Sequence, residues 1–179
     1  MKLSRALLAE VLGSLLLAGV VIGSGILGER LADGNAAIAL LANTAATAAI
    51  LFVLITALSP ISGAHFNPAV TLVMVLNQTI KPAEAVLYVL AQFGGCIGGA
   101  LLGHAMFELP LLQSSVHVRT GVAQWLAEAV ATCGLLFIVL GHRGPQNAPW
   151  MVAAWIGAAY WFTASTSFAN PAITIARSL

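Results

Sequence analysis

The residues with the clearest chemical meaning in this sequence form a tripeptide that occurs twice, Asn67-Pro68-Ala69 and Asn170-Pro171-Ala172. Asn is a strongly preferred helix N-cap, and Pro fits the first helical position, where its missing N–H would have had no partner. Each tripeptide therefore predicts the start of a helix. The flanks are alike too, since similar small, polar and aromatic residues precede each copy over 62–66 and 165–169. We interpret the pair as an internal repeat.

The chemistry of this repeat depends on where the two helix starts meet. A helix N-terminus carries roughly half a positive charge, so two such ends facing one point would repel cations. The side-chain oxygens of Asn67 and Asn170 can cap their own helices while the amide NH₂ groups donate to a polar solute. Such a path would pass neutral hydrogen-bonding solutes and oppose ions and proton hopping. The alternative is that the two residues only cap helices, and capping and lining are compatible.

Two carboxylates and one amide stand inside apolar stretches, Glu10, Glu128 and Gln92. An ionisable group at membrane depth is costly and faces the protein interior. One interpretation makes Glu10 and Glu128 an acid/base pair, but no nucleophile or metal cluster accompanies them. The favoured one is structural: each carboxylate accepts hydrogen bonds from backbone N–H groups of an irregular loop, which have no partner in hydrocarbon. Gln92 is expected to act in the same way.

Histidines are scattered over the chain without a metal-binding spacing, at His65, His104, His117 and His142. We therefore expect no metal site and no cofactor. His65 stands two residues before Asn67. It either borders the path or is a buried histidine bonded to a backbone carbonyl, and the sequence does not separate these two.

The composition sets the class of protein. Of the 179 residues, 60% are hydrophobic and only 7% are charged, against about 25% charged residues in ordinary globular domains. Such a chain cannot build a solvated surface, which predicts a multi-pass helical protein in a lipid bilayer. A formal net charge of +1 without a basic cluster excludes a nucleic-acid partner.

Five apolar segments are long enough to cross a bilayer, at residues 5–28, 36–58, 83–107, 121–141 and 148–166. The segments 61–79 and 165–179 each hold one tripeptide and are too short to span. They predict re-entrant half-helices, which are tolerated only where they are buried in protein or line a wet cavity.

Positive charge in the short connections predicts the orientation. One side of the membrane has more positively charged residues than the other. Lys2, Arg5, Lys81, His142 and Arg143 are expected on the first side, and Arg30, Arg119 and Arg177 on the second. The N-terminus is therefore expected in the cytoplasm. The half-helices enter from opposite sides, because an odd number of crossings separates them.

The chain divides into two related halves, residues 1–107 and 121–179, joined by an extracellular loop over 108–120. Each half begins with a helix that carries one Glu and continues with a second helix and a half-helix. Opposite entry of the half-helices makes this an inverted repeat, in which broken helices meet near the midplane. The third full helix of the second half, the sixth of the fold, is absent from this sequence, and we interpret this as a fragment, a truncated gene product or a subunit that a neighbour completes.

These residues resemble the aquaporin and aquaglyceroporin (major intrinsic protein) superfamily, through Ser62-Gly63-Ala64-His65-Phe66-Asn67-Pro68-Ala69-Val70-Thr71, the second Asn170-Pro171-Ala172, and a Glu in the first helix of each half. The resemblance implies an all-α, right-handed membrane bundle with two half-helices around one pore per subunit. It also implies homotetramers in the cell (plasma or inner) membrane and passive flow without a cofactor. Backbone carbonyls before each Asn would act as acceptors.

The resemblance also assigns a selectivity filter. Counting without gaps from each Asn gives Thr47, Ala158, Ser167 and Ile173, where the family typically has an aromatic, a His or Gly, and an Arg directly after the second tripeptide. We therefore expect a wider and less polar constriction than in a strict water channel. Arg177 stands one helical turn beyond Ile173, and long side chains lean back toward the helix N-terminus, so our hypothesis is that it partly replaces the missing charge.

The expected function is a passive channel for small uncharged solutes, namely glycerol, urea or neutral metalloid acids, with or without water. The main alternative is a truncated, non-conducting membrane protein with a role in assembly. A membrane enzyme that uses Glu10 and Glu128 ranks third, so the chain is expected not to be an enzyme.

Overall fold

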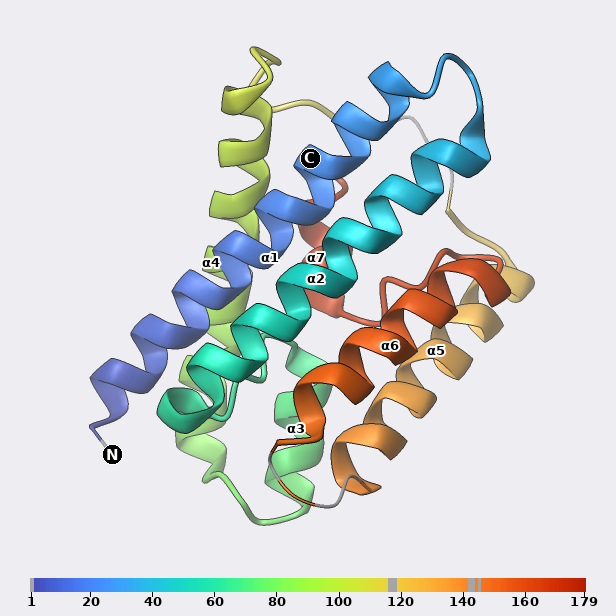
Figure 1. The fold of residues 1–179 in the computed structure, drawn as a ribbon. Helices are drawn as coiled ribbons and strands as arrows, with labels where there is room; N and C mark the ends of the chain where they lie inside the picture. The colour runs from blue at the N-terminus through green and yellow to red at the C-terminus, as the bar shows by residue number, and fades with distance from the viewer. Residues whose placement is uncertain (1, 116–118, 142–143, 145) are drawn as a thin grey trace.

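The computed structural model describes residues 2–115, 119–141, 144 and 146–179 as a bundle of helices (Figure 1). His117, His142 and Arg143 lie outside the described residues. The seven helices of the described part are α1 (Leu3–Leu31), α2 (Ala36–Ser62), α3 (Pro68–Leu76), α4 (Pro82–Met106), α5 (Val122–Gly141), α6 (Ala148–Phe162) and α7 (Pro171–Ala176).

Four of these helices, α1, α2, α4 and α5, are long and apolar enough to cross a membrane. The segment expected to cross at 148–166 is shorter than predicted, because its helix α6 has 15 residues and ends at Phe162. A helix of that length extends about 22 Å, less than the ~30 Å hydrocarbon core. The helix stops there because Thr163 takes an extended conformation, with φ −103° and ψ 139°. The chain then continues as the loop that leads to the second tripeptide.

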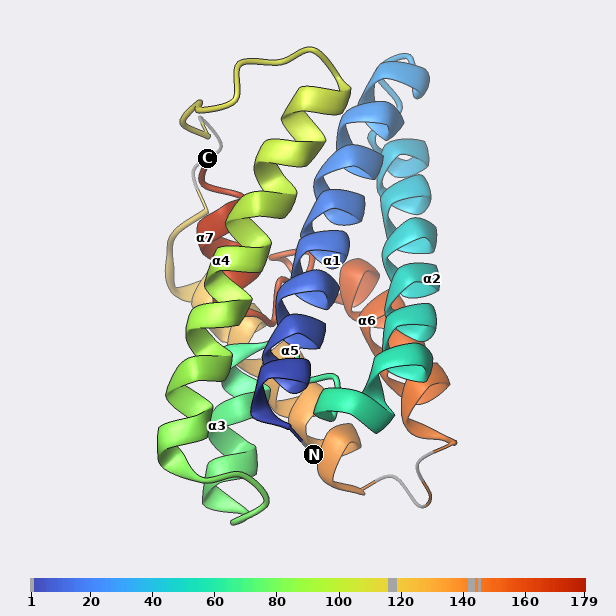
Figure 2. The ribbon, with the colours of Figure 1, turned by 90° about the vertical axis from the view of Figure 1, so that its left-hand side faces the viewer.

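The two half-helices lie one above the other beside α4, with α7 nearer the C-terminus and α3 nearer the N-terminal end of α1 (Figures 1 and 2). Pro68 and Pro171 occupy the first helical positions of α3 and α7, as the tripeptides predict. Both half-helices start in the middle of the bundle and run toward opposite ends. This all-helical arrangement is the aquaporin-like membrane fold.

Close packing of α1 against α4 holds the first half together, and glycines of α4 allow it. A Cβ on Gly95 would come within 2.5 Å of the Val11 carbonyl oxygen, and one on Gly99 would collide with the Leu15 carbonyl oxygen. Gly94, one residue away, has nothing within 4 Å of such a Cβ. Small residues therefore let the α4 backbone approach α1, which carries Glu10.

Candidate functional site

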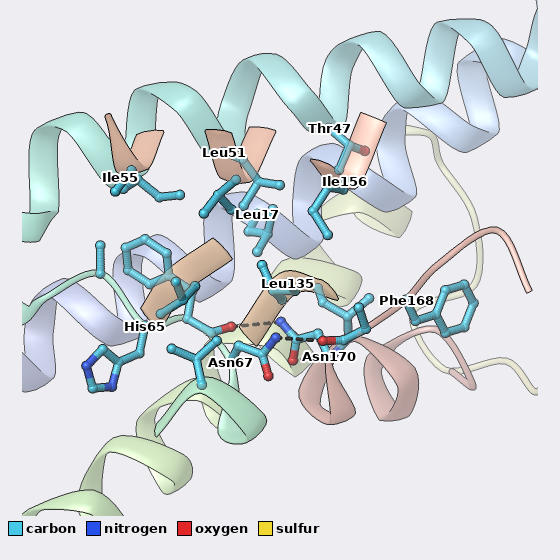
Figure 3. Close-up of a pocket in the computed structure, with 18 of the residues that line it drawn as sticks. Leu17, Thr47, Leu51, Ile55, His65, Asn67, Leu135, Ile156, Phe168 and Asn170 are labelled. Carbon is cyan, nitrogen blue, oxygen red and sulfur yellow. Dashed lines mark hydrogen bonds between the residues drawn. The ribbon is translucent and has the colours of Figure 1, made fainter. Parts of the chain in front are cut away.

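The two tripeptides meet through a reciprocal pair of hydrogen bonds. The Asn67 Nδ2 donates to the Ala169 carbonyl oxygen at 2.7 Å, and the Asn170 Nδ2 donates to the Phe66 carbonyl oxygen at 2.8 Å (Figure 3). Each Asn also caps its own half-helix, since the two Oδ1 atoms accept from the backbone N–H groups of Ala69 and Ala172 at 2.9 and 3.0 Å. An amide NH₂ has two hydrogens, so one per Asn stays available to a solute. The sequence predicts the caps but not these crossed bonds.

The loops before the two Asn residues have the same backbone shape. Residues four, three and one positions before each Asn have positive φ, namely Gly63, Ala64 and Phe66 in the first loop and Thr166, Ser167 and Ala169 in the second. Left-handed backbone is strained for residues with a side chain, at about 1–2 kcal/mol each. It persists only where surrounding contacts impose it. The contacts that do so are also the same in both loops.

A carboxylate holds each loop. The Glu10 oxygens accept from the backbone N–H groups of His65 and Phe66 at 3.0 and 2.8 Å. In the second loop, the Glu128 oxygens accept from the N–H groups of Phe168 and Ala169 at 2.9 and 2.7 Å. The same two loop positions are bonded in both halves. Both carboxylates are therefore occupied by backbone donors, which leaves them unsuited to acid/base chemistry.

Within the described part of the chain, the first carboxylate has further hydrogen-bond partners that the second does not share. Glu10 is completely buried and also accepts from the Ser62 hydroxyl at 2.6 Å and from the Gln92 Nε2 at 2.8 Å. Gln92 donates to the Thr71 hydroxyl as well, at 2.9 Å. The Glu10 carboxylate thus accepts four hydrogen bonds, which ties α1, the first loop and α4 together.

A cavity of about 190 Å³ runs past both Asn residues. Figure 3 shows Asn67 and Asn170 at its middle, with Ile55 and His65 toward one end and Thr47 and Phe168 toward the other. One buried water needs about 10–15 Å³ of such volume, so the cavity suits a file of waters or a solute of several heavy atoms.

The walls of the cavity differ in polarity. One side is mainly apolar and is built by side chains of α1, α2, α5 and α6, among them Leu17, Leu51, Leu135 and Ile156. The opposite side is formed by the two loops and half-helices, which carry the Asn amides. A solute in this cavity therefore meets most hydrogen-bonding groups along one side, since among the described residues the other side carries hydroxyls only at Thr47, Ser59 and Tyr160.

The predicted filter position Ala158 is wrong, because this residue is exposed on the outer side of α6 and does not line the cavity. Ile156 and Tyr160 line it instead, together with Val152, at helical spacings of four residues. Residues two apart on a helix point about 200° apart, so an ungapped count that is off by two selects the opposite face. The sequence holds no clear signal for the correct face, because Met151 and Trp155 share this spacing and do not line the cavity.

The wall of the cavity near Thr47 contains an aromatic side chain, Tyr160, although the predicted filter positions hold none. The Tyr160 hydroxyl lies 3.2 Å from the Thr47 Oγ1, and both residues are buried. The other two predicted filter residues, Ser167 and Ile173, also line the cavity. The Ser167 Oγ is buried and has no hydrogen-bond partner among the described residues. We call the cavity end bordered by Thr47, Tyr160, Ser167 and Ile173 the C-terminal mouth.

The two further residues predicted near the pore lie at its opposite ends. His65 lines the cavity, and its Nδ1 lies 3.1 Å from the Thr71 hydroxyl rather than beside a backbone carbonyl. Arg177 follows α7 as its C-cap and does not line the cavity. Its guanidinium carbon instead lies 4.3 Å from the centre of the Phe168 ring. The sequence did not single out Phe168.

The two half-helices meet through their capping Asn residues and lie beside a cavity in a bundle of membrane helices. This arrangement defines an aquaporin-like channel. Comparison with known proteins agrees, because the family model described as Major intrinsic protein matches residues 1–179. The chain belongs to the major intrinsic protein family. Members of this family are channels and not enzymes, so the chain is a passive membrane channel for water and small solutes.

The curated relatives include aquaglyceroporins and aquaporins. "Aquaglyceroporin AqpS" of Rhizobium meliloti (strain 1021) is 53% identical, over 98% of this chain and 76% of the relative. "Aquaporin A" of Dictyostelium discoideum is 32% identical, over 99% of this chain and 69% of the relative. "Probable aquaporin PIP2-8" of Oryza sativa subsp. japonica is 38% identical, over 82% of this chain and 54% of the relative. The chain thus spans about half to three quarters of the length of these relatives.

Proposed function

We propose that this channel passes small uncharged polar solutes such as glycerol, urea or neutral metalloid acids, with water as an accompanying permeant. The observation that carries the proposal is the cavity with one mainly apolar side and one line of hydrogen-bonding groups past Asn67 and Asn170. A polyol has both a polar edge and a CH-rich edge, which match these two sides. The 53% identity to a protein named an aquaglyceroporin supports the same class of solute.

Ions are opposed at the middle of the cavity. The starts of α3 and α7 meet there, and the aligned peptide dipoles of each half-helix give its start a partial positive charge. The remaining amide hydrogens of Asn67 and Asn170 donate to oxygen atoms of a solute. A water that accepts from both must turn its own hydrogens away, which interrupts a chain of proton transfer.

Selection by size takes place at the C-terminal mouth, where Thr47, Tyr160, Ser167 and Ile173 form the filter. Ile173 replaces an Arg at the position directly after the second tripeptide. The filter is therefore less polar than one with an Arg there, which favours solutes that carry CH groups.

The arrangement in the membrane follows from the repeat. Residues 1–107 and 121–179 form the two halves and 108–120 the extracellular connection, with the N-terminus in the cytoplasm and the protein in the cell membrane. The matched loop geometry of the two halves supports this division. The channel works as a homotetramer with one cavity per subunit. Large apolar side chains exposed on α2, such as Leu41, Phe52 and Val53, suit contact with lipid or with neighbouring subunits.

Stopped-flow light scattering on proteoliposomes tests the proposal. Vesicles with the wild-type chain should equilibrate glycerol and urea faster than protein-free vesicles. Asn67→Leu should abolish most of this flux, because it removes both a cap and a donor from the cavity. Asn77→Leu is the matched control, since Asn77 is exposed at the far end of α3. Wild-type flux equal to that of protein-free vesicles, from correctly folded protein, would overturn the proposal and favour the assembly role.

A further inference from the structure

The cavity wall before Asn67 carries an imidazole ring whose two nitrogens have different surroundings. The His65 Nδ1 lies 3.1 Å from the Thr71 hydroxyl oxygen, whereas its Nε2 has no hydrogen-bond partner within the described part of the chain. The residue is partly buried and lines the cavity at the end where Ile55 lies (Figure 3). A neutral imidazole has one N–H and one bare nitrogen, so the place of the proton decides whether Nε2 is a donor or an acceptor.

The Thr71 hydroxyl has three neighbours and only one hydrogen. Its oxygen lies 3.1 Å from the Asn67 carbonyl oxygen, 2.9 Å from the Gln92 Nε2 and 3.1 Å from the His65 Nδ1. The carbonyl oxygen can only accept and the amide nitrogen can only donate. The hydroxyl hydrogen therefore points either to the carbonyl oxygen or to the imidazole.

The second half of the chain shows which of the two bonds the half-helix makes. Thr174 stands four residues after Asn170, as Thr71 does after the first Asn, and its hydroxyl donates to the Asn170 carbonyl oxygen at 3.0 Å. No imidazole stands before it, because the position of His65 is taken by Phe168 in the second loop. This bond thus belongs to the half-helix itself. When Thr71 makes it too, the imidazole Nδ1 has to be the donor.

The Gln92 amide is held in one orientation by the carboxylate of α1. Its Nε2 donates to the Glu10 Oε2 at 2.8 Å, and a turned amide would bring two acceptor oxygens together. The second hydrogen of the same Nε2 points to Thr71. Gln92, Glu10 and Thr71 are completely buried, which keeps water from replacing these bonds. The His65 ring also packs against Tyr88, with 5.2 Å between the ring centres.

We propose that Thr71 is a positioning residue that holds His65 in the Nδ1–H form, so that the bare Nε2 accepts a hydrogen bond from the passing solute. A Cβ on Gly63, which also lines the cavity, would lie 3.2 Å from this Nε2, so the nitrogen is beside the path. The role of Nε2 rests on the proposed function, because it concerns what the solute meets in the same cavity. The solute finds an acceptor here and a donor at the Asn67 amide, an order that suits molecules with both kinds of group, such as polyols and urea.

Solid-state ¹⁵N NMR of histidine-labelled protein in proteoliposomes tests the position of the proton. It is recorded at about pH 8, where histidine is ordinarily neutral and its N–H and bare nitrogens give separate signals. The His65 signals are those that a His65→Phe sample lacks, and we expect a protonated Nδ1 and a bare Nε2. His104 supplies a reference for this form in the same spectrum, because its Nδ1 lies 3.0 Å from the Leu111 carbonyl oxygen, which can only accept.

Three threonine variants test the positioning role. Thr71→Val removes the acceptor of Nδ1, so the ratio of Nδ1–H to Nε2–H in His65 should fall about twofold to tenfold, the range that one lost hydrogen bond accounts for. Thr71→Ser keeps the hydroxyl and should keep the wild-type signals. The matched control is Thr174→Val, which removes the corresponding bond of the second half-helix and should leave the His65 signals unchanged.

Stopped-flow uptake of glycerol and urea tests the role of Nε2. His65→Phe copies the ring that Phe168 supplies in the second loop and removes the acceptor. Both permeabilities should fall about twofold to tenfold below wild type, because the solute then sheds water at this end without a replacement bond.

The outcomes separate the position of the proton from conduction. A bare Nδ1 and a protonated Nε2 in the wild type would overturn the tautomer, whether or not Thr71→Val folds. An unchanged ratio in folded Thr71→Val, or an equal fall in Thr174→Val, would show that Thr71 does not position the ring. If the wild type conducts and His65→Phe conducts equally fast, only the role of Nε2 is wrong. A wild type that conducts neither solute would refute the proposed function and that role together, while the spectra still decide the tautomer.

Discussion

Replacing Glu10 by Gln is the most direct perturbation of the loop that carries Asn67. The Oε1 of Glu10 accepts from Ser62 and His65, and the Oε2 accepts from Phe66 and Gln92. A Gln side chain has nearly the same shape but replaces one of these oxygens by an NH₂ group. Whichever way the amide turns, one fixed backbone donor then faces a donor, the N–H of His65 or that of Phe66, while the Ser62 hydroxyl or the Gln92 amide can turn to accept.

The magnitude follows from this count. A buried backbone donor left without an acceptor costs about 1–3 kcal/mol, which is the loss expected for Glu10→Gln. No water relieves the cost cheaply, since Glu10 and Gln92 are both completely buried. A loss of 1 kcal/mol lowers the midpoint of thermal unfolding by about 2–4 °C in a chain of this size, so the variant should unfold at least about 2 °C lower. The loosened loop should also reduce glycerol flux.

Thermal unfolding of detergent-solubilised protein and stopped-flow glycerol uptake measure the two effects. Glu108→Gln is the matched control, because Glu108 is exposed in the loop after α4 and such substitutions change stability by about 0.5 kcal/mol or less. If Glu10→Gln unfolds at the same temperature as Glu108→Gln and conducts glycerol equally well, the carboxylate does not support the loop and the reasoning fails.

Two other predictions use neighbouring pairs of residues. Gly95→Ala should destabilise the bundle by about 1–3 kcal/mol, since its Cβ would meet the backbone of α1. Gly94→Ala should instead stabilise α4 by about 0.5–1 kcal/mol. Chemical denaturation under identical conditions compares the two variants, and equal stability would show that the packing of α4 against α1 is misassigned. Tyr160→Ala should widen the C-terminal mouth and admit polyols larger than glycerol, while Ala158→Phe on the outer face of α6 should leave the size limit unchanged. A series of polyols of increasing length in swelling assays measures this, and a lower size limit in Ala158→Phe would contradict the placement of that residue.

Local chemistry explains why the helix starts were predictable from the sequence. An Asn followed by Pro defines a cap and a first turn whatever surrounds it, and α3 and α7 begin at Pro68 and Pro171 accordingly. The long apolar runs defined α1, α2, α4 and α5 in the same way. The end of α6 was misplaced by four residues, because the apolar sequence continues past Phe162 while the backbone already turns into a loop.

Contacts between distant segments were not predictable. The filter count chose Ala158 because it fixed a distance along the chain, whereas the face of α6 depends on how the helix is rotated against α2. The stacking of Arg119 and Arg177 on Phe168 likewise depends on where a loop crosses the bundle. No periodicity in the sequence contains that information.

The reciprocal bonds between the two loops also constrain how the chain is made. The acceptor of the Asn67 amide, the Ala169 carbonyl, follows 102 residues later. At a synthesis rate of about 5–20 residues per second, the first loop waits roughly 5–20 s for its partner. During that interval its amide has to be hydrated or held by other components at the site of insertion. The two loops can therefore form their reciprocal hydrogen bonds only after the second loop has been synthesised and inserted.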